Sequence, residues 1–218
     1  MKCIQNILFL IIAFACFNGI SQVQKKFFVD DVQAVDYVTV NFCVGDDAKI
    51  NKVTIVEDKT TYLNKENIQK LKDYLLTIEY YPESKLRNNC YDSTFEFINS
   101  NYQELKLTEE NCQKCAKFLK GKYQYEDVLY SKTKIKRGRK IQREITTNNG
   151  RQIYRIKWNS NCTYVLTYLR MSQNRYKHLI GKEILVEIID LLPNDRYVYK
   201  SIAEFDGKIV FGVMKMIK

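Results

Sequence analysis

Apolar and polar side chains alternate along residues 37–44, a pattern typical of a strand with one buried face. The apolar positions on one face are Val38, Val40, Phe42 and Val44. A Gly-Asp-Asp turn follows at residues 45–47, and residues 52–57 then place Val53 and Ile55 on one face. The pattern therefore predicts a β-hairpin near the start of the chain.

A helical pattern begins after this hairpin. Asn64 is a favourable N-cap, and Glu66 suits the positive end of the helix dipole. Apolar residues then recur at helical spacing, at Ile68, Leu71, Leu75 and Ile78. The helix is expected to end before Pro82, and residues 94–98 favour another strand. This order predicts an α+β unit, in which the helix covers one face of a small antiparallel sheet.

The rest of the chain favours strands. A short helix capped by Thr108, with Cys112 and Cys115 both toward the core, is followed by segments rich in β-branched and aromatic residues. Eight strands are predicted, at residues 122–130, 132–136, 141–147, 151–158, 162–170, 184–191, 196–203 and 208–216. Such short antiparallel strands with one apolar face predict a closed barrel or a strongly curled sheet. The many large aromatic residues favour a filled interior.

The N-terminal residues indicate export. Lys2 precedes an uninterrupted apolar run at residues 7–17, and small residues follow at Gly19 and Ser21. Residues 1–22 are therefore predicted to be a signal peptide, which leads to the periplasm or cell envelope. Lipid attachment at Cys16 is the less favoured alternative. Because no second long apolar run follows, no transmembrane segment is expected after cleavage.

Charge divides the chain into two parts. Residues 23–112 carry 11 Lys and Arg against 16 Asp and Glu, whereas residues 113–182 carry 18 against 3. This shift predicts two domains, at residues 23–107 and 108–218. The densest basic segment predicts a basic patch of Lys132, Lys134, Lys136, Arg137, Arg139 and Lys140. A strand with one solvated face explains this segment best, and attraction to an anionic surface is the alternative. Nucleic acid is not expected as a partner of an exported chain.

Few residues have the chemistry of an active site. The single histidine, His178, lies in a polar segment and is expected at the surface. Glu144 is expected to form a cross-strand ion pair with Arg137 or Arg143 rather than an acid/base pair. Cys112 and Cys115 have CxxC spacing, but a second pair of zinc ligands and the preceding strand of a thioredoxin-like site are missing. We therefore predict no catalytic activity, no cofactor and no metal site.

Several motifs in the N-terminal half of the chain occur in the same order as in a known protein domain. They are Val38-x-Val40-x-Phe42 before a glycine turn, Lys52-Val53-x-Ile55, a helix from Lys65, Tyr81-Pro82 and Phe95-x-Phe97. Over about residues 30–102 they resemble the C-terminal domain of TonB as it occurs in Bacteroidetes. The resemblance implies an exposed sheet edge that accepts an extended peptide of an envelope protein by strand addition. The residues of this predicted binding edge are Val38, Val40, Phe42, Thr94, Phe95 and Phe97.

A second group of motifs runs from about residue 112 to the C terminus. It comprises Cys115-x-x-Phe118-x-x-Gly121-x-Tyr123, Arg137 with Gln142 and Glu144, Ile156-Lys157-Trp158 before Cys162-x-Tyr164, and Gly181-Lys182 before Ile184-x-Val186. These residues resemble a family of small exported Bacteroidetes proteins of uncharacterised function that have lipocalin-like β-barrels. The resemblance implies a barrel that is filled by side chains or holds one small apolar ligand.

Five of the seven cysteines lie beyond the predicted signal peptide, and such thiols tend to pair in an oxidising compartment. The residues alone do not choose among the pairings. The lipocalin-like resemblance implies a bridge between Cys115 and Cys162. Cys43 occupies the polar face of its strand, which is unusual for a free thiol, so we expect it to pair with Cys90. Cys112 is then left without a partner.

Together these patterns predict an exported, non-catalytic binding protein with two domains. The first functional hypothesis is docking of an extended peptide on the front sheet. The alternatives are a small apolar ligand held in the barrel and adhesion to an anionic surface.

Overall fold

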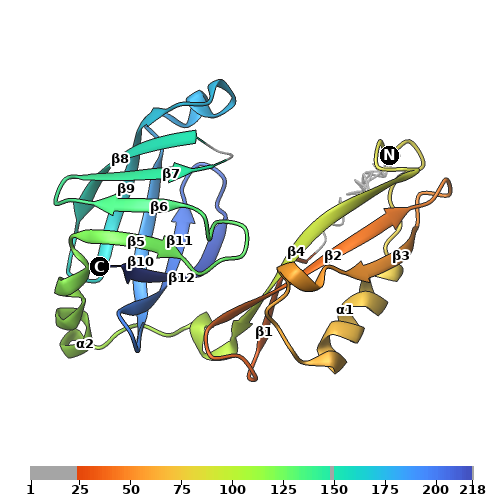
Figure 1. The fold of residues 1–218 in the computed structure, drawn as a ribbon, viewed down its shortest axis with the longest axis horizontal. Helices are drawn as coiled ribbons and strands as arrows, with labels where there is room; N and C mark the ends of the chain where they lie inside the picture. Colours follow the sequence, from red (N-terminus) through yellow and green to blue (C-terminus); the bar gives the residue numbers. More distant parts are fainter. Residues whose placement is uncertain (1–23, 148–149, 218) are drawn as a thin grey trace, which may run out of the picture.

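The computed structural model describes residues 24–147 and 150–217, and these residues form two units built on separate sheets (Figure 1). The predicted signal peptide, with Cys16, lies outside the described residues. The coarse outline of the predicted fold is confirmed, because a small sheet with one helix precedes a closed antiparallel barrel. Within the described ranges, no helix has the length and apolar character needed to cross a membrane.

The first unit is a mixed sheet. Its described strands follow the order β1 (Lys26–Val29), β4 (Asn89–Asn99), β2 (Val35–Val44) and β3 (Ile50–Ile55). The β2–β3 hairpin and the antiparallel pairing of β2 with β4 agree with the predicted elements. β1 was not predicted, and it pairs in parallel with β4. A strand of this length is too short for alternation to mark it in the sequence.

The predicted binding edge is wrong for four of its six residues. Val38, Val40 and Phe42 lie on β2, between β4 and β3, and Phe97 lies where β1 pairs with β4. Thr94 and Phe95 lie on the part of β4 that β1 does not cover. Val38, Phe95 and Phe97 are also buried in the core. Alternation shows which face of a strand is apolar, but it does not show which strand lies at an edge. Peptide docking by strand addition stays a prediction; the outer strands β1 and β3 and the part of β4 that β1 leaves uncovered are where it would occur.

Helix α1 (Lys65–Leu76) packs on one face of this sheet. The predicted N-cap is confirmed, because the Asn64 side chain accepts hydrogen bonds from the backbone N–H groups of Glu66 and Asn67. The helix ends earlier than predicted. Ile78, which was expected in the helix, instead accepts a hydrogen bond from the backbone N–H of Ile50, so this segment extends along β3 rather than continuing α1. A short 3-10 helix, η1 (Glu57–Lys59), connects β3 with the segment before α1.

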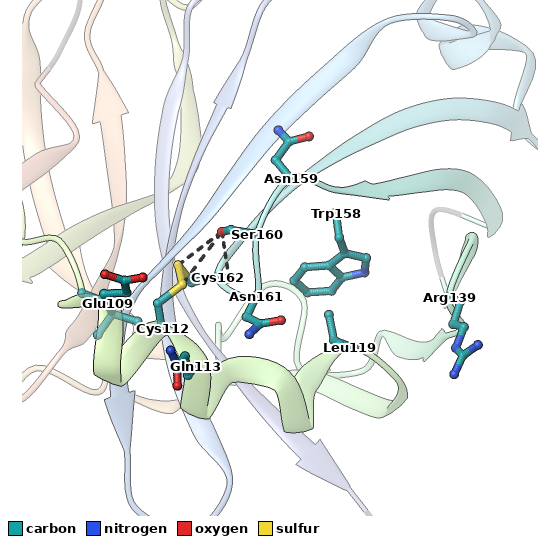
Figure 2. Close-up of a pocket in the computed structure, with 11 residues that line it drawn as sticks. Glu109, Cys112, Gln113, Leu119, Arg139, Trp158, Asn159, Ser160, Asn161 and Cys162 are labelled. Atoms are coloured by element: carbon teal, nitrogen blue, oxygen red, sulfur yellow. Dashed lines mark hydrogen bonds between the residues drawn. A yellow bond between two sulfur atoms is a disulfide. The ribbon is translucent and has the colours of Figure 1, made fainter.

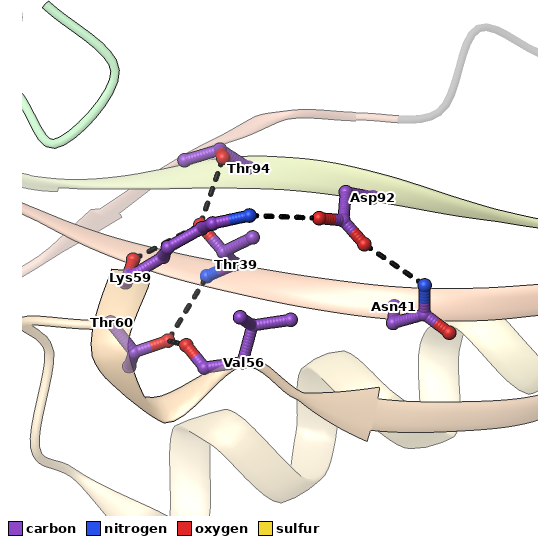
Figure 3. Close-up of polar contacts among 7 residues, drawn as sticks. All are labelled: Thr39, Asn41, Val56, Lys59, Thr60, Asp92 and Thr94. Carbon is purple, nitrogen blue, oxygen red and sulfur yellow. Dashed lines mark hydrogen bonds and ion pairs between the residues drawn. The ribbon is translucent and has the colours of Figure 1, made fainter.

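The opposite face of the sheet is polar and follows the strand register. Thr39 faces Thr94, and their hydroxyl groups lie 2.9 Å apart; Asn41 faces Asp92 and donates a hydrogen bond of 2.9 Å to it (Figure 3). Lys59 adds an ion pair of 3.0 Å to Asp92. Since the paired polar residues satisfy one another, this face is stable without a covering helix.

The second unit is an eight-stranded antiparallel barrel, which is the closed form of the two predicted alternatives, a barrel or a strongly curled sheet. Its strands are β5 (Gly121–Tyr125), β6 (Lys134–Arg137), β7 (Ile141–Thr146), β8 (Gly150–Trp158), β9 (Thr163–Met171), β10 (Glu183–Leu192), β11 (Arg196–Ala203) and β12 (Ile209–Ile217). Each described strand pairs with its neighbour in sequence, and β12 closes the barrel by pairing with β5. A 3-10 helix, η4 (Asn174–Leu179), lies between β9 and β10.

One end of the barrel is closed by the segment that leads into β5. This segment contains α2 (Glu109–Lys114) and the 3-10 helix η3 (Cys115–Phe118). The Phe118 ring packs on Tyr197 with 4.7 Å between centroids, and the Tyr123 hydroxyl donates a hydrogen bond of 2.7 Å to the Phe118 carbonyl. Thr108 caps α2 as predicted.

The two units share an apolar contact. Ile98 and Tyr102 of the first unit are buried with Val198 and Phe211 on the outer wall of the barrel. Tyr102, in the 3-10 helix η2 (Ser100–Gln103), donates a hydrogen bond of 2.7 Å to Asp190. This contact lies close to the predicted boundary at residue 107.

Glu96 lies on the polar face of β4, and one of its carboxylate oxygens is buried without a hydrogen-bond partner among the described residues. Burial raises the pKa of Glu96 to about 7, against the opposing effect of Lys26 and with a smaller contribution from Asp127. A carboxyl whose pKa is raised by folding favours the folded state at low pH, and that contribution is lost as the pH rises from the unfolded value of 4.5 through about 7.

Glu96→Gln is therefore expected to leave stability almost unchanged at pH 4.5 and to raise the free energy of unfolding by on the order of 1–3 kcal/mol at pH 8. Urea unfolding at the two pH values measures this difference. Asp92→Asn is the matched control on the same strand, because hydrogen bonds from Asn41 and Lys59 lower the pKa of Asp92. It should lose stability at pH 8. Equal effects of the two substitutions at pH 8 would contradict the assignment.

Two disulfides lie within the described residues. The predicted Cys43–Cys90 bridge is confirmed; it joins directly paired residues of β2 and β4, whose Cα atoms are 4.0 Å apart. The second bridge joins Cys112 to Cys162, so the predicted pairing of Cys115 with Cys162 is wrong. Cys115 is free and fully buried. α2 ends before Cys115, and the tighter turn of η3 points this side chain into the closed barrel end while Cys112 stays near the surface.

Candidate ligand-binding site in the barrel

The barrel encloses a cavity of about 340 Å³ at the end opposite α2. Its described lining residues are Tyr125, Asp127, Tyr130, Thr133, Glu144, Thr146, Gln152, Tyr154, Tyr168, Met171, Tyr176, Leu179, Ile184, Tyr199, Ser201 and Val210. All eight strands or their adjoining turns contribute to this wall. The prediction of a filled interior therefore holds for the α2 end of the barrel and fails for the other end.

Arg137 forms the plug between the closed end and the cavity. It is 2% exposed, and its guanidinium donates hydrogen bonds to Gln142 Oε1 at 2.7 Å, Tyr164 Oη at 2.9 Å and Tyr197 Oη at 3.0 Å. It also lies 4.6 Å from the centroid of the Tyr123 ring. These contacts offset the cost of burying a charge. Arg137 thus does not belong to the predicted basic patch, because the strand alternation turns it inward with Thr133 and Ile135.

The polar chain continues from Arg137 toward the cavity. Gln142 Nε2 donates a hydrogen bond of 2.7 Å to Glu144 Oε1, and the Tyr125 hydroxyl donates one of 3.1 Å to the same oxygen. Burial raises the pKa of Glu144 against these hydrogen bonds and the charge of Arg137. The predicted ion pair with Arg137 or Arg143 is wrong, since Gln142 lies between Glu144 and Arg137 and since Arg143 is exposed.

Tyrosines dominate the wall of the cavity. Among its described lining residues, the tyrosines are Tyr125, Tyr130, Tyr154, Tyr168, Tyr176 and Tyr199. Tyr154 and Tyr168 pack with 4.8 Å between ring centroids, and Tyr125 lies 6.1 Å from Tyr130 and 6.2 Å from Tyr199. Gly212 leaves space for one of these rings, because a Cβ atom at this position would lie 2.6 Å from the Tyr199 hydroxyl. The result is a cavity with flat aromatic faces and hydroxyl groups at their edges.

The turn between β5 and β6 borders the mouth of the cavity. Asp127 in this turn accepts a hydrogen bond of 2.6 Å from the backbone N–H of Leu129, and burial raises the pKa of Asp127. Tyr130, which is 45% exposed, lines the barrel cavity and also a second cavity of about 820 Å³ between the barrel and the polar face of the first sheet. The same turn therefore contacts both units.

The remaining residues of the predicted basic patch are exposed, namely Lys132, Lys134, Lys136, Arg139 and Lys140. Lys136 lies directly opposite Lys122 on β5 and Arg143 on β7. A row of like charges across three strands costs stability, so these residues are not placed there to support the sheet. Adhesion to an anionic surface stays a prediction. The structure also places His178 at the surface, in η4.

A shallow groove of about 810 Å³ lies beside the second disulfide (Figure 2). The Cys112–Cys162 bridge forms part of its wall, together with Leu119, Trp158 and Arg139. The free thiol of Cys115 is buried behind this surface, and burial raises its pKa to about 11. A thiol that stays protonated is a poor nucleophile, so the CxxC spacing does not form a reactive pair in this arrangement.

Of the two carboxyl residues in the described lining, Asp127 and Glu144, the sequence indicated only Glu144, and for a different role. The signal it missed is on β7, where Gln142 and Glu144 point inward while Ile145 is 54% exposed. A strand with polar residues inside and apolar residues outside marks a barrel whose interior is not a purely apolar core.

The chain matches none of the protein-family models, curated proteins or solved structures with which it was compared. The resemblances to the TonB C-terminal domain and to lipocalin-like proteins therefore stay predictions.

Proposed function

We propose that this protein is an exported binding protein whose barrel holds a small organic ligand. The observation that carries the proposal is the cavity at the open end of the barrel, set against the dense packing of the closed end. An eight-stranded barrel is wide enough to be filled by its own side chains or to hold one small ligand. In this barrel, side chains fill the end next to α2, and the opposite end has space for a small ligand.

The lining of the cavity supports binding rather than catalysis. Its tyrosine faces supply apolar contact area, while Glu144, Gln152 and Thr146 supply hydrogen-bonding groups. Such a mixture of aromatic walls and a few polar groups is typical of small-molecule sites. The sequence led to the expectation of an apolar ligand. This lining instead favours a ligand with an apolar body and one polar end.

Two further features support a role outside the cytosol. The described residues contain two disulfides, which are typical of exported proteins and rare in the reducing cytosol. Together with the predicted signal peptide at residues 1–22, they support export to the periplasm or cell envelope. The first unit then serves as a separate framework for contacts with other molecules.

The proposal predicts that filling the cavity abolishes binding. The neutral fluorescent dye N-phenyl-1-naphthylamine should bind the parent protein with increased emission, because the cavity shields it from water. Ser201→Phe places a large ring into the cavity wall and should weaken dye binding at least tenfold. Fluorescence titration measures this difference.

Thr147→Phe is the matched control, since this residue is exposed next to the end of β7 and does not line the cavity. It should leave dye affinity unchanged, and both variants should be checked for an unchanged far-UV spectrum. Equal affinities of the parent and the Ser201→Phe variant would contradict the proposal, as would an absence of dye binding to the parent protein.

A further inference from the structure

The barrel cavity differs in charge from the rest of the molecule. The chain has a net charge of +10, and the segment that forms β5 to β9 is its most basic part. Yet among the described residues that line the cavity there is no Lys, Arg or His, whereas two carboxyl groups, those of Asp127 and Glu144, are present. The basic side chains of this segment point outward or, in the case of Arg137, lie below the cavity.

The carboxyl groups lie at two levels of the cavity. Glu144 is at the floor, where Gln142 and Tyr125 fix its carboxylate through Oε1. Asp127 is at the mouth, in the turn that carries Tyr130. Glu144 is buried and Asp127 is half-buried, and burial raises the pKa of both carboxyl groups because each ionised form lacks full solvation. A cation in the cavity would supply the missing stabilisation.

Tyrosine rings surround the space between these carboxyl groups. The face of an aromatic ring carries negative electrostatic potential and attracts an organic cation, most strongly where water is excluded. The same attraction is seen below the cavity, in the packed part of the barrel, where the Arg137 guanidinium lies over the rings of Tyr123 and Tyr164 at 4.6 and 4.7 Å. The rings of Tyr154, Tyr168 and Tyr199 line the cavity above it.

Resting on the proposed function, we infer that the ligand of the barrel carries an organic ammonium group, which sits among the cavity tyrosines between Glu144 and Asp127. Among the described residues, Arg137 is the buried cation near this position, and its charge opposes a second cation. Its guanidinium is already engaged by Gln142, Tyr164 and Tyr197, and Gln142 separates it from Glu144. The carboxyl of Asp127 at the other end of the cavity has no such basic neighbour in the lining.

The test uses three probes of the same shape and different charge. Choline is a cation, 3,3-dimethyl-1-butanol is its neutral isostere, and 3,3-dimethylbutyrate is an anion of similar size. Each is titrated against the complex of the intact protein with N-phenyl-1-naphthylamine, and displacement of the dye gives its relative affinity. We expect choline to displace the dye at a concentration at least tenfold lower than the neutral isostere and the anion.

Substitutions identify the groups responsible. The Glu144→Gln/Asp127→Asn variant keeps the size of both side chains and removes both charges, so the preference for choline over the neutral isostere should fall to about onefold. The dye affinity of this variant is measured first, so that the ratio of the choline and isostere affinities reports the effect of charge alone. Glu109→Gln on α2, at the opposite end of the barrel, is the matched control and should keep the full preference.

The outcomes separate the inference from the function on which it rests. If the dye binds but choline has no advantage over its neutral isostere, or if none of the three probes displaces the dye, the ammonium ligand is excluded while the binding function stands. A preference that survives in the Glu144→Gln/Asp127→Asn variant also overturns the inference. If the dye does not bind the parent protein, the proposed function itself fails.

Discussion

Replacing Arg137 by Met is expected to lower the free energy of unfolding of the barrel by about 3–5 kcal/mol, because each buried polar group left without its donor costs about 1–3 kcal/mol. The methionine keeps much of the side-chain volume but removes the donor group shared by Gln142, Tyr164 and Tyr197. These polar atoms would then be buried without their partner, which costs more than the loss of the hydrogen bonds alone. Urea unfolding followed by tryptophan fluorescence is a direct measure, because Trp158 is the only tryptophan and its ring lies 5.7 Å from the guanidinium.

Arg139→Met is the control for this prediction. Arg139 is exposed in the turn after β6, so its substitution should change the free energy of unfolding by no more than about 0.5 kcal/mol. If both variants were equally stable, Arg137 would not be buried among the tyrosines, and the floor of the cavity would be misassigned.

Removing the second disulfide is expected to cost about 4 kcal/mol in the Cys112→Ala/Cys162→Ala variant. The estimate follows from the chain entropy that a bridge spanning 50 residues removes from the unfolded state. Cys115→Ala should cost only about 1 kcal/mol, because it removes a single buried sulfur and keeps both bridges. Thermal or urea unfolding under non-reducing conditions compares the two variants.

Peptide mapping without reduction gives an independent check of the same bridge. A cross-linked peptide containing Cys112 and Cys162 is expected, and Cys115 should react with iodoacetamide only after unfolding, since burial raises its pKa to about 11. A cross-linked peptide containing Cys115 and Cys162 would contradict the structure and restore the pairing implied by the sequence resemblance.

The strands of the barrel could be predicted from the sequence because each carries a local signal. Along β8, for example, Tyr154 and Ile156 are buried while Arg155 and Lys157 are exposed, as the alternation indicates. Closure of the barrel depends instead on the pairing of β12 with β5, strands that are far apart in the chain. A local pattern cannot specify such a pair, so a barrel and a curled sheet stayed alternatives.

The errors at the candidate site have a common cause. Arg137 is basic, so the sequence interpretation placed it at the surface. The strand alternation instead places it on the same inner face as Thr133 and Ile135, and all three are buried. The same emphasis on residue type placed Glu144 in a cross-strand ion pair with Arg137 or Arg143. Polar side chains that point into a barrel depart from the usual pattern of apolar residues inside. Such departures are expected at binding sites.

In the first unit, the sequence predicted the faces of the strands but not their order. β1 covers the last four residues of β4 and β3 covers the far side of β2, so most residues proposed as a binding edge lie inside the sheet. The cysteines show the same limit. Cys43 and Cys90 are paired by the register of two neighbouring strands, whereas the choice between Cys112 and Cys115 depends on where a short helix ends.

The central claim is that one end of the barrel is open to a ligand while the other end is closed. Two methionines of the barrel report on its two ends. Met171 lines the cavity, whereas Met214 lies in the closed end beside Tyr197. The most direct measurement is a titration of protein carrying ¹³C-methyl methionine with N-phenyl-1-naphthylamine, followed by NMR. The account predicts a shift of the Met171 methyl signal with no change at Met214. A shift confined to Met214, or none at either residue when the dye is bound, would contradict it.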